Sequence, residues 1–576
     1  MQSGYPRPQF VRENWINLNG VWKFLFDDQN IGEKERWYDS FPSDWKEIQV
    51  PFSYETSLSG IGEETFHPVV WYQKEIDLKK TEKKLLLHLE GADYTAVVWM
   101  NGQFAGKHTG GYARFSLDIT NYIKDGINII TVRVEDSVSC IQPRGKQRWE
   151  DKNFGCWYVQ TTGIWKTVWM EEVPKYYIEK LKLTPDLDNA SVKLEIKLNK
   201  KPEKPKNISC KILLDKREIT TYLIQAATQY ITAELKVANE DVPWQVAVWS
   251  PENPKLYDIE LEFFGGTESD KVTSYFGMRK ISIEGGNILL NNLPLYQRLI
   301  LDQGYWEESH LTPPSEEALI KDIDLVLAAG YNGVRKHEKV EDERFLYWCD
   351  RKGLLVWCEM PSVYTFQEDS IEQFTNQWME IVRQNYNHPC IVVWTAFNES
   401  WGIERVYSDK NQQKFTEGIY HLTKAFDTMR PVIVNDGWEH TVSDIITLHD
   451  YEESGDVFAE RYGKKEAITE NQIPFNNHRY AMAKGYRYRG QPIIISEYGG
   501  IAFQTKEGWG YGNQVADEKD FLERFKRITD AIKKTDYSVG FCYTQVTDVQ
   551  QEVNGLYTAK REPKVDMEEI RKINLS

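Results

Sequence analysis

The sequence predicts a multidomain protein in which two β-sandwiches are followed by a (β/α)₈ barrel. At 576 residues, the chain is too long for one hydrophobic core, because single cores stop growing at roughly 250–300 residues. Its first half consists of short alternating segments separated by turns, which is typical of β-sandwiches. Its second half alternates short apolar runs with helical patterns, which is typical of βα units around a parallel sheet.

The first predicted sandwich covers residues 1–173 and the second covers residues 174–282. In the first, VVWMNGQFAG (Val97 to Gly106) contains Asn101-Gly102, a dipeptide that favours the two-residue turn of a β-hairpin. In the second, VKLEIKLN, ISCKILLD and LYDIELEFF are expected to be strands of an immunoglobulin-like sandwich. This second domain contains few candidate catalytic residues.

The barrel is predicted over residues 283–576, with helical stretches between its strands. One such stretch, SEEALIKDIDLVLAAG, has Ser315 as a cap and Gly330 as a stop. The sixth connection, about 451–490, is longer and irregular. Eight runs are the candidate strands: QRLILD (297–302), NGVRKH (332–337), LLVWCEM (354–360), IVVWTAF (391–397), PVIVND (431–436), IITLHD (445–450), PIIISE (492–497) and VGFCYTQ (539–545).

Composition excludes several classes of partner. A net charge of −17 argues against nucleic acid and anionic membranes, which bind clustered Lys and Arg. We expect no membrane span and no secretory signal, and the seven scattered cysteines have no zinc-like spacing, so a cytoplasmic protein with reduced thiols is predicted. Aromatic residues reach 13%, which suits a carbohydrate partner because sugar C–H faces pack on aromatic rings, although β-domain cores also use them.

Polar residues terminate most of the predicted barrel strands. In such barrels the active site lies at the carboxyl ends of the strands, so these residues are candidate site residues. They are Asp302, His337, Glu359, Glu399, Asp436, His449, Asp450, Glu497 and Gln545.

Glu399 and Glu497 end the fourth and seventh predicted strands and would face each other across the barrel mouth. A single Glu at a strand end is usually a loop anchor, but a facing pair fits glycoside hydrolysis. Retaining enzymes hold two carboxyl groups about 5–5.5 Å apart, one to protonate the leaving oxygen and one to attack the anomeric carbon. Their environments must keep one protonated and the other ionised.

Several motifs extend this prediction to the whole chain. NHPCIVVWTAFNES (Asn387 to Ser400) and IISEYGG (Ile494 to Gly500) resemble the acid/base and nucleophile segments of glycoside hydrolase family 2. WINLNGVWKF and TTGIWKTVWM are similar to the family's jelly-roll-like sugar-binding sandwich, WSPENPKLYDIEL to its immunoglobulin-like domain, and CDRKGLLVWCEMP to its TIM barrel.

The resemblance implies roles for individual residues. It makes Glu399 the acid/base, Glu497 the nucleophile, and Asn398 the partner of the sugar's 2-hydroxyl. Tyr451 falls where the family keeps a tyrosine beside the nucleophile, although a packing role would explain it too. Further implied substrate contacts are Asp302, Arg335, His337, Asp436, Trp438, His449, Tyr543 and Gln545.

The chain also departs from the family pattern. Arg335 is followed by Lys336 and His337, where many members have Ser-His. No counterparts of the family's magnesium ligands follow Glu359, so neither a catalytic metal nor another cofactor is expected. The Asn-x-Lys motif of family glucuronidases is replaced by Glu552, Val553 and Asn554, which disfavours a uronate unless Arg335, Lys336 or another cation binds it.

The sequence thus predicts a retaining exo-glycosidase that removes a non-reducing terminal sugar. β-Galactosidase activity is the first expectation, by family prevalence, and α-L-arabinofuranosidase, α-L-arabinopyranosidase and β-glucuronidase activities stay open. A non-catalytic carbohydrate-binding protein is the rival from another class, and glycosyl transfer through the same intermediate is a third reading. Association into a homo-oligomer is left open.

Overall fold

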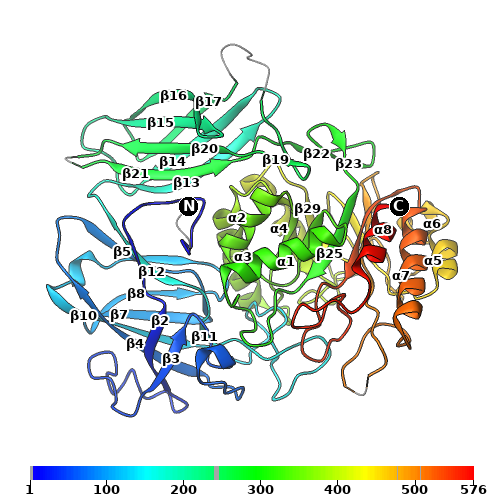
Figure 1. Ribbon diagram of the computed structural model, residues 1–576, viewed down its shortest axis with the longest axis horizontal. Helices are drawn as coiled ribbons and strands as arrows, with labels where there is room; N and C mark the ends of the chain where they lie inside the picture. The colour runs from blue at the N-terminus through cyan, green and yellow to red at the C-terminus, as the bar shows by residue number, and fades with distance from the viewer. Residues whose placement is uncertain (1–3, 239–245, 267, 477, 506) are drawn as a thin grey trace.

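The computed structural model describes residues 4–238, 246–266, 268–476, 478–505 and 507–576. In these ranges two β-sandwiches and a barrel with outer helices follow one another along the chain, which confirms the predicted fold class (Figure 1). Each of the three has its own large apolar core. Among the described residues, every helix is too short or too polar to cross a membrane.

The first sandwich packs a six-stranded sheet on a four-stranded sheet. Asn101 and Gly102 join β7 to β8 with φ values of 51° and 76°, the left-handed pair that a type I′ hairpin turn requires, so the predicted hairpin is confirmed. The six strands, in sheet order, are β3 (Lys46–Val50), β2 (Gly20–Phe26), β4 (Val69–Leu78), β10 (Gly126–Glu135), β7 (Thr95–Met100) and β8 (Gln103–Thr109). The four are β1 (Trp15–Asn17), β12 (Val168–Val173), β5 (Lys84–Leu89) and β9 (Phe115–Asp118), while β6 (Ala92–Asp93) pairs with β11 (Gly163–Ile164).

The second sandwich has the alternation expected of strands with one buried face. In β20 (Tyr257–Phe263) every second side chain, from Tyr257 to Phe263, is buried. One sheet contains β13 (Ile178–Asp186), β14 (Ser191–Leu198) and β17 (Tyr230–Lys236); the other adds β16 (Arg217–Ala226), β15 (Lys206–Leu214) and β21 (Asp270–Phe276) to β20. The short pair β18 (Trp249–Ser250) and β19 (Asn253–Pro254) lies between β17 and β20 in the chain. A three-stranded element follows the sandwich and contains β22 (Ile281–Glu284), β23 (Asn287–Leu290) and β24 (Leu293–Pro294).

The barrel contains all eight predicted strands, and each hydrogen-bonded ladder between them is parallel. They are almost wholly buried, as strands covered on both faces must be. Their bounds are β25 (Gln297–Asp302), β26 (Gly333–Lys336), β27 (Leu355–Glu359), β28 (Ile391–Asn398), β29 (Val432–Asp436), β30 (Ile446–His449), β31 (Ile493–Gly499) and β32 (Ser538–Thr544).

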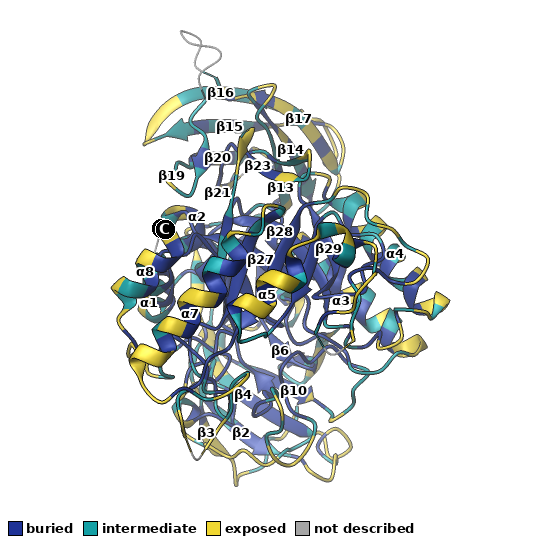
Figure 2. Cartoon of the chain, turned by 90° about the vertical axis from the view of Figure 1, so that its right-hand side faces the viewer, coloured by how far each residue is buried: buried dark blue, intermediate teal, exposed yellow. Residues whose placement is uncertain are grey.

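Helices surround the strands, and their outer faces are exposed (Figure 2). Ser315 caps α1, since its side chain accepts the Ala318 N–H, and Gly330 follows with a left-handed φ of 86°. The irregular sixth connection holds two short helices. The helices are α1 (Glu316–Ala328), α2 (Glu343–Lys352), α3 (Glu368–Asn385), α4 (Lys410–Phe426), α5 (Gly455–Tyr462), α6 (Lys465–Thr469), α7 (Glu518–Lys533) and α8 (Met567–Leu575), with single turns η1 (Ser57–Ser59) and η2 (Thr120–Tyr122).

One connection of the first sandwich reaches the barrel mouth. It runs from residue 136 to residue 162, between β10 and β11. Its Arg144 N–H donates to the Ser362 carbonyl at 3.0 Å, and its Asn153 side chain donates to Gln550 at 2.6 Å. The mouth is therefore bordered by two domains.

Candidate active site

The two predicted catalytic carboxylates meet at the carboxyl ends of the barrel strands. Glu399 directly follows β28 in a left-handed conformation with φ of 50°, and Glu497 lies in β31. His449 lies between them, with its Nδ1 atom 2.9 Å from Glu399 Oε1 and 3.4 Å from Glu497 Oε2. One oxygen of each carboxylate and a ring nitrogen of His449 lie within 4.8 Å of one another. This spacing is compatible with a retaining pair, whose carboxyl groups are about 5–5.5 Å apart.

Glu497 is held as a carboxylate by its neighbours. Arg335 Nη1 donates to its Oε1 at 2.9 Å, and the Tyr451 hydroxyl donates to its Oε2 at 2.5 Å. Burial would raise the pKa of Glu497, but the positive charges of His449 and Arg335 outweigh burial and lower it. Glu497 is therefore ionised at neutral pH, as a nucleophile must be.

His449 is a charged group at the centre of the site. Burial lowers the pKa of its imidazole, but the Glu497 and Asp436 carboxylates raise that pKa to about 10. The side chain of Glu399 is 19% exposed, against 5% for Glu497. The two carboxylates thus share one cation but differ in their access to solvent.

Arg335 is a buried cation that binds three carboxylates of the site. It is fully buried and forms ion pairs with Glu359 at 2.7 Å, Asp436 at 2.7 Å and Glu497 at 2.9 Å. It also donates to Asn398 Oδ1 at 3.2 Å. With its donors occupied in this way, Arg335 fixes the positions of the Glu497 carboxylate and of Asn398.

Asn398 has a donor directed into the site. Its Oδ1 accepts from Arg335, while its Nδ2 has no hydrogen-bond partner among the described residues although it is buried. Buried polar groups are almost always paired, so an unpaired donor beside the two facing carboxylates is suited to a ligand oxygen. A sugar hydroxyl is one such acceptor.

His337 directly follows β26, and Asp302 ends the neighbouring strand β25. His337 Nδ1 is 2.9 Å from Glu359 Oε2, and burial, together with the charges of Lys146 and Arg335, holds the pKa of His337 well below its usual value. Asp302 Oδ2 is 2.7 Å from Lys336 Nζ, which also contacts Glu341 at 2.7 Å. Lys336, like Arg335, is therefore already neutralised by carboxylates.

Three further residues predicted to contact substrate have partners within the protein. Asp436 is fully buried behind the site, bonded to Arg335 and to the Ser496 hydroxyl at 2.6 Å. Tyr543 points to the outside of the barrel, where its ring is 5.0 Å from Phe525 of α7. Gln545 remains at the mouth, but its amide donates to Asn554 at 2.7 Å.

A cavity of about 740 Å³ opens beside the acid/base candidate. Of the predicted site residues, Glu399, Trp438 and Tyr451 line it. The rest of the wall comes from loops whose residues carry no periodic signal in the sequence. They are Glu439, Asp450, Glu452, Arg461, Asn476, His478, Arg479 and Tyr511.

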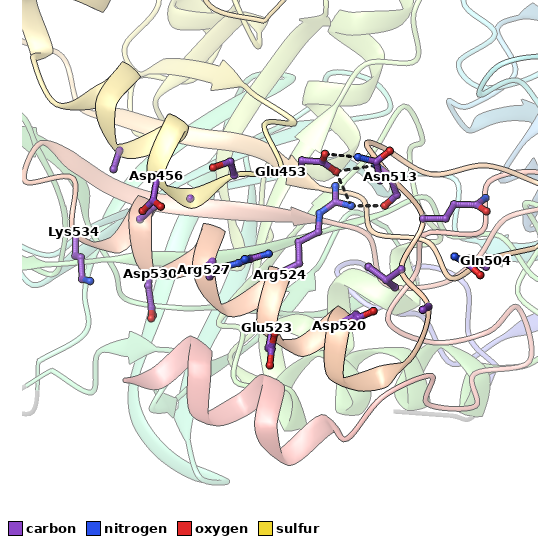
Figure 3. A pocket seen from close by; sticks show the side chains of 17 residues that line it. Glu453, Asp456, Gln504, Asn513, Asp520, Glu523, Arg524, Arg527, Asp530 and Lys534 are labelled. Atoms are coloured by element: carbon purple, nitrogen blue, oxygen red, sulfur yellow. Dashed lines mark hydrogen bonds and ion pairs between the residues drawn. The ribbon is translucent and has the colours of Figure 1, made fainter.

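A second cavity, of about 690 Å³, lies on the outer surface near α5 and α7 (Figure 3). Within its lining, Glu453 contacts Arg524 at 3.3 Å and the Asn513 side chain at 2.6 Å. It shares no lining residue with the cavity at the barrel mouth.

Two groups of side chains in the described residues have the geometry of metal ligands. One contains Glu399, His449 and Glu497, and there the Glu497 and Asp436 carboxylates raise the pKa of His449 to about 10 against the effect of burial. The other lies at α2, where His388 Nδ1 bonds to Asp350 at 2.6 Å and the Cys390 N–H donates to the same carboxylate at 2.8 Å. These bonds give the second group a structural role.

Comparison with known proteins assigns the family. The model of the glycosyl hydrolases family 2 TIM barrel domain matches residues 281–575, the family's sugar binding domain matches residues 16–174, and its middle domain matches residues 176–279. The chain belongs to glycosyl hydrolases family 2. It is thus a glycoside hydrolase, and its substrate is a carbohydrate.

The relatives differ in their activities. A β-glucuronidase of Chlorocebus aethiops is 24% identical over 97% of this chain and 91% of its own length, and a β-galactosidase of Thermoanaerobacter pseudethanolicus is 26% identical over 85% and 62%. A Formosa agariphila relative is 28% identical over 74% of this chain, which spans only 51% of that protein. The solved β-glucuronidase of an uncultured Clostridium shares the fold, with a TM-score of 0.79, 21% identity and coverage of 98% of both chains.

Proposed function

We propose that this family 2 enzyme is a retaining exo-glycosidase in which Glu497 is the nucleophile and Glu399 the acid/base. The Glu497 carboxylate attacks the anomeric carbon while the Glu399 proton passes to the leaving oxygen, and a glycosyl ester forms on Glu497. Ionised Glu399 then takes a proton from water, the water oxygen attacks the same carbon, and the ester bond breaks. The observation that carries the proposal is the close approach of the two carboxylates across His449.

Neighbouring groups support each step. The Tyr451 hydroxyl and Arg335 bind opposite oxygens of Glu497, which fixes the direction of its attack. The unpaired Nδ2 of Asn398 can donate to a sugar hydroxyl, and such bonds strengthen as charge develops in the transition state.

For the sugar, we infer a β-glucuronide in first place, ahead of the β-galactoside first expected from the sequence. Named β-glucuronidases match this chain over nearly its whole length, whereas the β-galactosidase match covers less. Arg335 and Lys336 are occupied, but Lys146 of the first sandwich is a further cation, only 6% exposed, whose ammonium lies 4.5 Å from the Trp401 ring. Lys146 would bind the sugar carboxylate in place of the missing Asn-x-Lys motif.

Lys146 and Glu552 form the side of the proposed sugar site on which the choice between glucuronide and galactoside depends. Burial lowers the pKa of Lys146, but Cys156 and the carboxylates of Glu552 and Glu338 outweigh burial and hold it above its usual value. Burial raises the pKa of Glu552, which is hydrogen-bonded to Tyr158 and accepts from Asn554 at 3.1 Å. Protonated, Glu552 can donate to a uronate; ionised, it favours a neutral sugar such as galactose, the second candidate.

A panel of 4-nitrophenyl glycosides tests the reaction and the sugar together. We expect β-glucuronide to have the highest kcat/KM, followed by β-galactoside, α-L-arabinopyranoside and α-L-arabinofuranoside. Proton NMR of the first product should show the configuration of the substrate. A product of opposite configuration would overturn the assignment of Glu497 as nucleophile, and a β-galactoside preference would overturn the choice of sugar.

Two variants separate the sugars at this side of the proposed site. Lys146→Met should lower kcat/KM for the glucuronide by about 10- to 100-fold, since a hydrogen bond to a charged group contributes about 1.5–3 kcal/mol, and should change the galactoside less. Glu552→Gln keeps a hydrogen-bond donor for the uronate and excludes the ionised state, so it should hold or raise the glucuronide-to-galactoside ratio. Equal effects on both substrates would assign Lys146 and Glu552 to general site structure.

A further inference from the structure

Two tyrosine rings stack beside the Glu497 carboxylate, and one of them bonds to that carboxylate. The Tyr451 hydroxyl donates to Glu497 Oε2 at 2.5 Å and contacts Thr544 Oγ1 at 3.0 Å. Tyr511, from the loop after β31, lies parallel to the Tyr451 ring, with ring centroids 3.4 Å apart and an angle of 5° between the ring planes. Tyr511 therefore covers one face of the ring that holds the Glu497 carboxylate.

The attraction between the two rings does not by itself account for this arrangement. Aromatic pairs prefer offset or edge-to-face geometries to full overlap. Centroids 3.4 Å apart in nearly parallel planes leave the Tyr451 and Tyr511 rings almost fully overlapped. Other contacts must therefore hold Tyr511 over Tyr451, and they come from the two segments that carry the rings.

The backbone of Tyr511 is held against the residue that follows β31. The Tyr511 N–H donates to the Gly500 carbonyl at 2.8 Å, and the Gly500 N–H donates to the Thr544 carbonyl at 2.9 Å. Gly500 has φ of 60°, and a Cβ atom there would lie 2.3 Å from Cδ2 of Tyr511. Glycine leaves room for the ring and adopts this left-handed φ without strain. The last glycine of the segment IISEYGG is thus explained by the ring that packs on it.

Three side chains join the two tyrosine segments on the outer surface of the barrel, and we call them the Arg524 clamp: Glu453, Asn513 and Arg524 (Figure 3). Arg524, on α7, donates to the Tyr511 carbonyl at 2.8 Å and to the Asn513 carbonyl at 2.6 Å. Glu453 contacts Arg524 at 3.3 Å and accepts the backbone and side-chain N–H groups of Asn513 at 2.8 Å and 2.6 Å. Glu453 follows Tyr451 by two residues, and Asn513 follows Tyr511 by two residues. The clamp therefore fixes both tyrosine segments relative to each other.

The Arg524 side chain is buried and lies directly against the loop that carries Tyr511. It is 5% exposed, so its bonds to the two carbonyl groups are shielded from water. Gly512 has φ of 67°, and a Cβ atom there would lie 2.5 Å from both Arg524 Nη2 and Glu453 Oε2. A planar guanidinium can donate to two carbonyl groups at once in a fixed geometry, which the single ammonium of a lysine does less well.

We propose that Tyr511 is a positioning residue for the nucleophile, and that the Arg524 clamp holds Tyr511 in place from the outer surface of the barrel. The inference rests on the proposed function, because it takes Glu497 as the nucleophile. Stacking confines the Tyr451 ring to the plane in which its hydroxyl meets Glu497. This bond directs the carboxylate and favours its ionised form. Tyr511 and the clamp thus act on the reaction through Tyr451.

Trapping of the nucleophile measures this role. A 2-deoxy-2-fluoro glycosyl fluoride of the sugar that the wild type prefers forms a C–O bond to Glu497 as its C–F bond breaks, and fluoride leaves without a proton from Glu399. Mass spectrometry follows the first-order rate constant at saturating reagent and locates the label. Labelling of the wild type at Glu497 establishes the nucleophile separately from the role of Tyr511. A label on another residue would refute the proposed function and this inference with it.

Tyr511→Ala and Arg524→Gln should lower the labelling rate constant by about 10- to 100-fold, since a displacement of about 1 Å can cost 100-fold in rate. Lower stability alone would reduce the labelled fraction but not this rate constant. Tyr511→Phe keeps the ring and should label as the wild type does. Arg527→Gln is the matched control, because Arg527 is exposed on the same helix and lines the same outer cavity.

Three results of the labelling experiment would overturn the proposal. The first is a wild-type rate constant in Tyr511→Ala or Arg524→Gln. The second is equal slowing in Tyr511→Phe, which would assign the effect to the hydroxyl and not to the stacked ring. The third is equal slowing in Arg527→Gln, which would remove the special role of the clamp.

The pH dependence of kcat/KM gives a second readout, which a merely structural role would not change. Burial raises the pKa of Glu497, while the charges of His449 and Arg335 lower it. The bond from Tyr451 lowers it too. Loss of this bond should therefore move the acid limb to higher pH in Tyr511→Ala and in Tyr451→Phe alike. The double variant should match Tyr451→Phe, whereas additive shifts would show that Tyr511 does not act through Tyr451 and would overturn the proposal.

Discussion

Two buried arginines organise two clusters of charge, and only one cluster has the geometry of a catalytic site. Arg335 at the barrel mouth binds Glu359, Asp436 and Glu497. Arg12, where the N-terminal segment meets both sandwiches, binds Asp270 at 2.8 Å and Glu171 at 3.0 Å. Both arginines are at most 5% exposed, so burial and ion pairing do not distinguish the two clusters.

The two clusters differ in one carboxylate: Glu399 at the barrel mouth forms its ion pair with His449 and not with the central arginine. In the Arg12 cluster the guanidinium lies between Glu171 and Asp270, and the pKa of Glu171 falls to about 2 because Arg12 and His88 outweigh burial. At the mouth, Glu399 contacts His449 and is partly exposed, and it faces the Arg335-bound Glu497. A second carboxylate with access to a cavity, held opposite a buried one, is what indicates catalysis.

The largest effect is expected when Glu497, the proposed nucleophile bound to Arg335, is replaced. Glu497→Gln should lower kcat by about 10,000-fold or more, as loss of a catalytic nucleophile commonly does, because an amide cannot form the glycosyl ester. Glu171→Gln is the matched control in the Arg12 cluster and should leave kcat unchanged while lowering the melting temperature. Steady-state kinetics and thermal melts measure both. Substantial activity in Glu497→Gln would refute the mechanism.

The acid/base gives the next largest effect. Glu399→Gln should lower kcat/KM by about 100- to 10,000-fold for a substrate with a poor leaving group, the usual range for general acid–base catalysis. The loss should be smaller for a 4-nitrophenyl glycoside, which needs less protonation, and added azide should restore turnover by attacking the glycosyl-enzyme. A loss independent of the leaving group would assign Glu399 a different role.

Exchanging each arginine for methionine should separate stability from chemistry. Arg12→Met leaves Glu171 and Asp270 buried without their cation, which should cost roughly 3–5 kcal/mol of stability and leave kcat/KM of the folded enzyme unchanged. Arg335→Met should cost similar stability and also abolish most activity. Thermal melts and active-site titration distinguish the cases. If Arg12→Met impaired turnover of the folded fraction, the two clusters would not be functionally separate.

The smallest effect is a change in pH dependence. The His449 imidazolium stabilises ionised Glu497, so His449→Gln removes a positive charge and raises the pKa of that carboxylate. Activity requires ionised Glu497 and is lost as pH falls through its pKa. The acid limb of the kcat/KM profile should therefore move to higher pH. An acid limb at the wild-type position would show that another group controls it.

The catalytic candidates could be located from the sequence because their signal is local. Glu399 and Glu497 each end a short apolar run, and in parallel barrels such ends meet at one mouth. Tyr543 could not be placed in this way. Strands covered on both faces are buried at nearly every position, as β32 is, so the sequence does not show which alternate side chains point inward.

Other site features depended on contacts between distant parts of the chain. Lys146, Trp149 and Trp157 belong to a sandwich connection with no strand or helix periodicity, yet they border the barrel mouth. The occupation of Arg335 and Lys336 by carboxylates also follows from their partners on other strands and loops. Neither feature has a signal within a short window of sequence.

The sequence by itself determined the three-domain fold, the eight barrel strands and the reaction class, because hydrophobic periodicity and strand-end carboxylates are properties of neighbouring residues. Tertiary structure decided which cation remains for a substrate, which side chains face the cavity, and how the first sandwich borders the acid/base. These properties depend on the distances between side chains from different strands and domains, since electrostatic and packing energies change over a few ångströms.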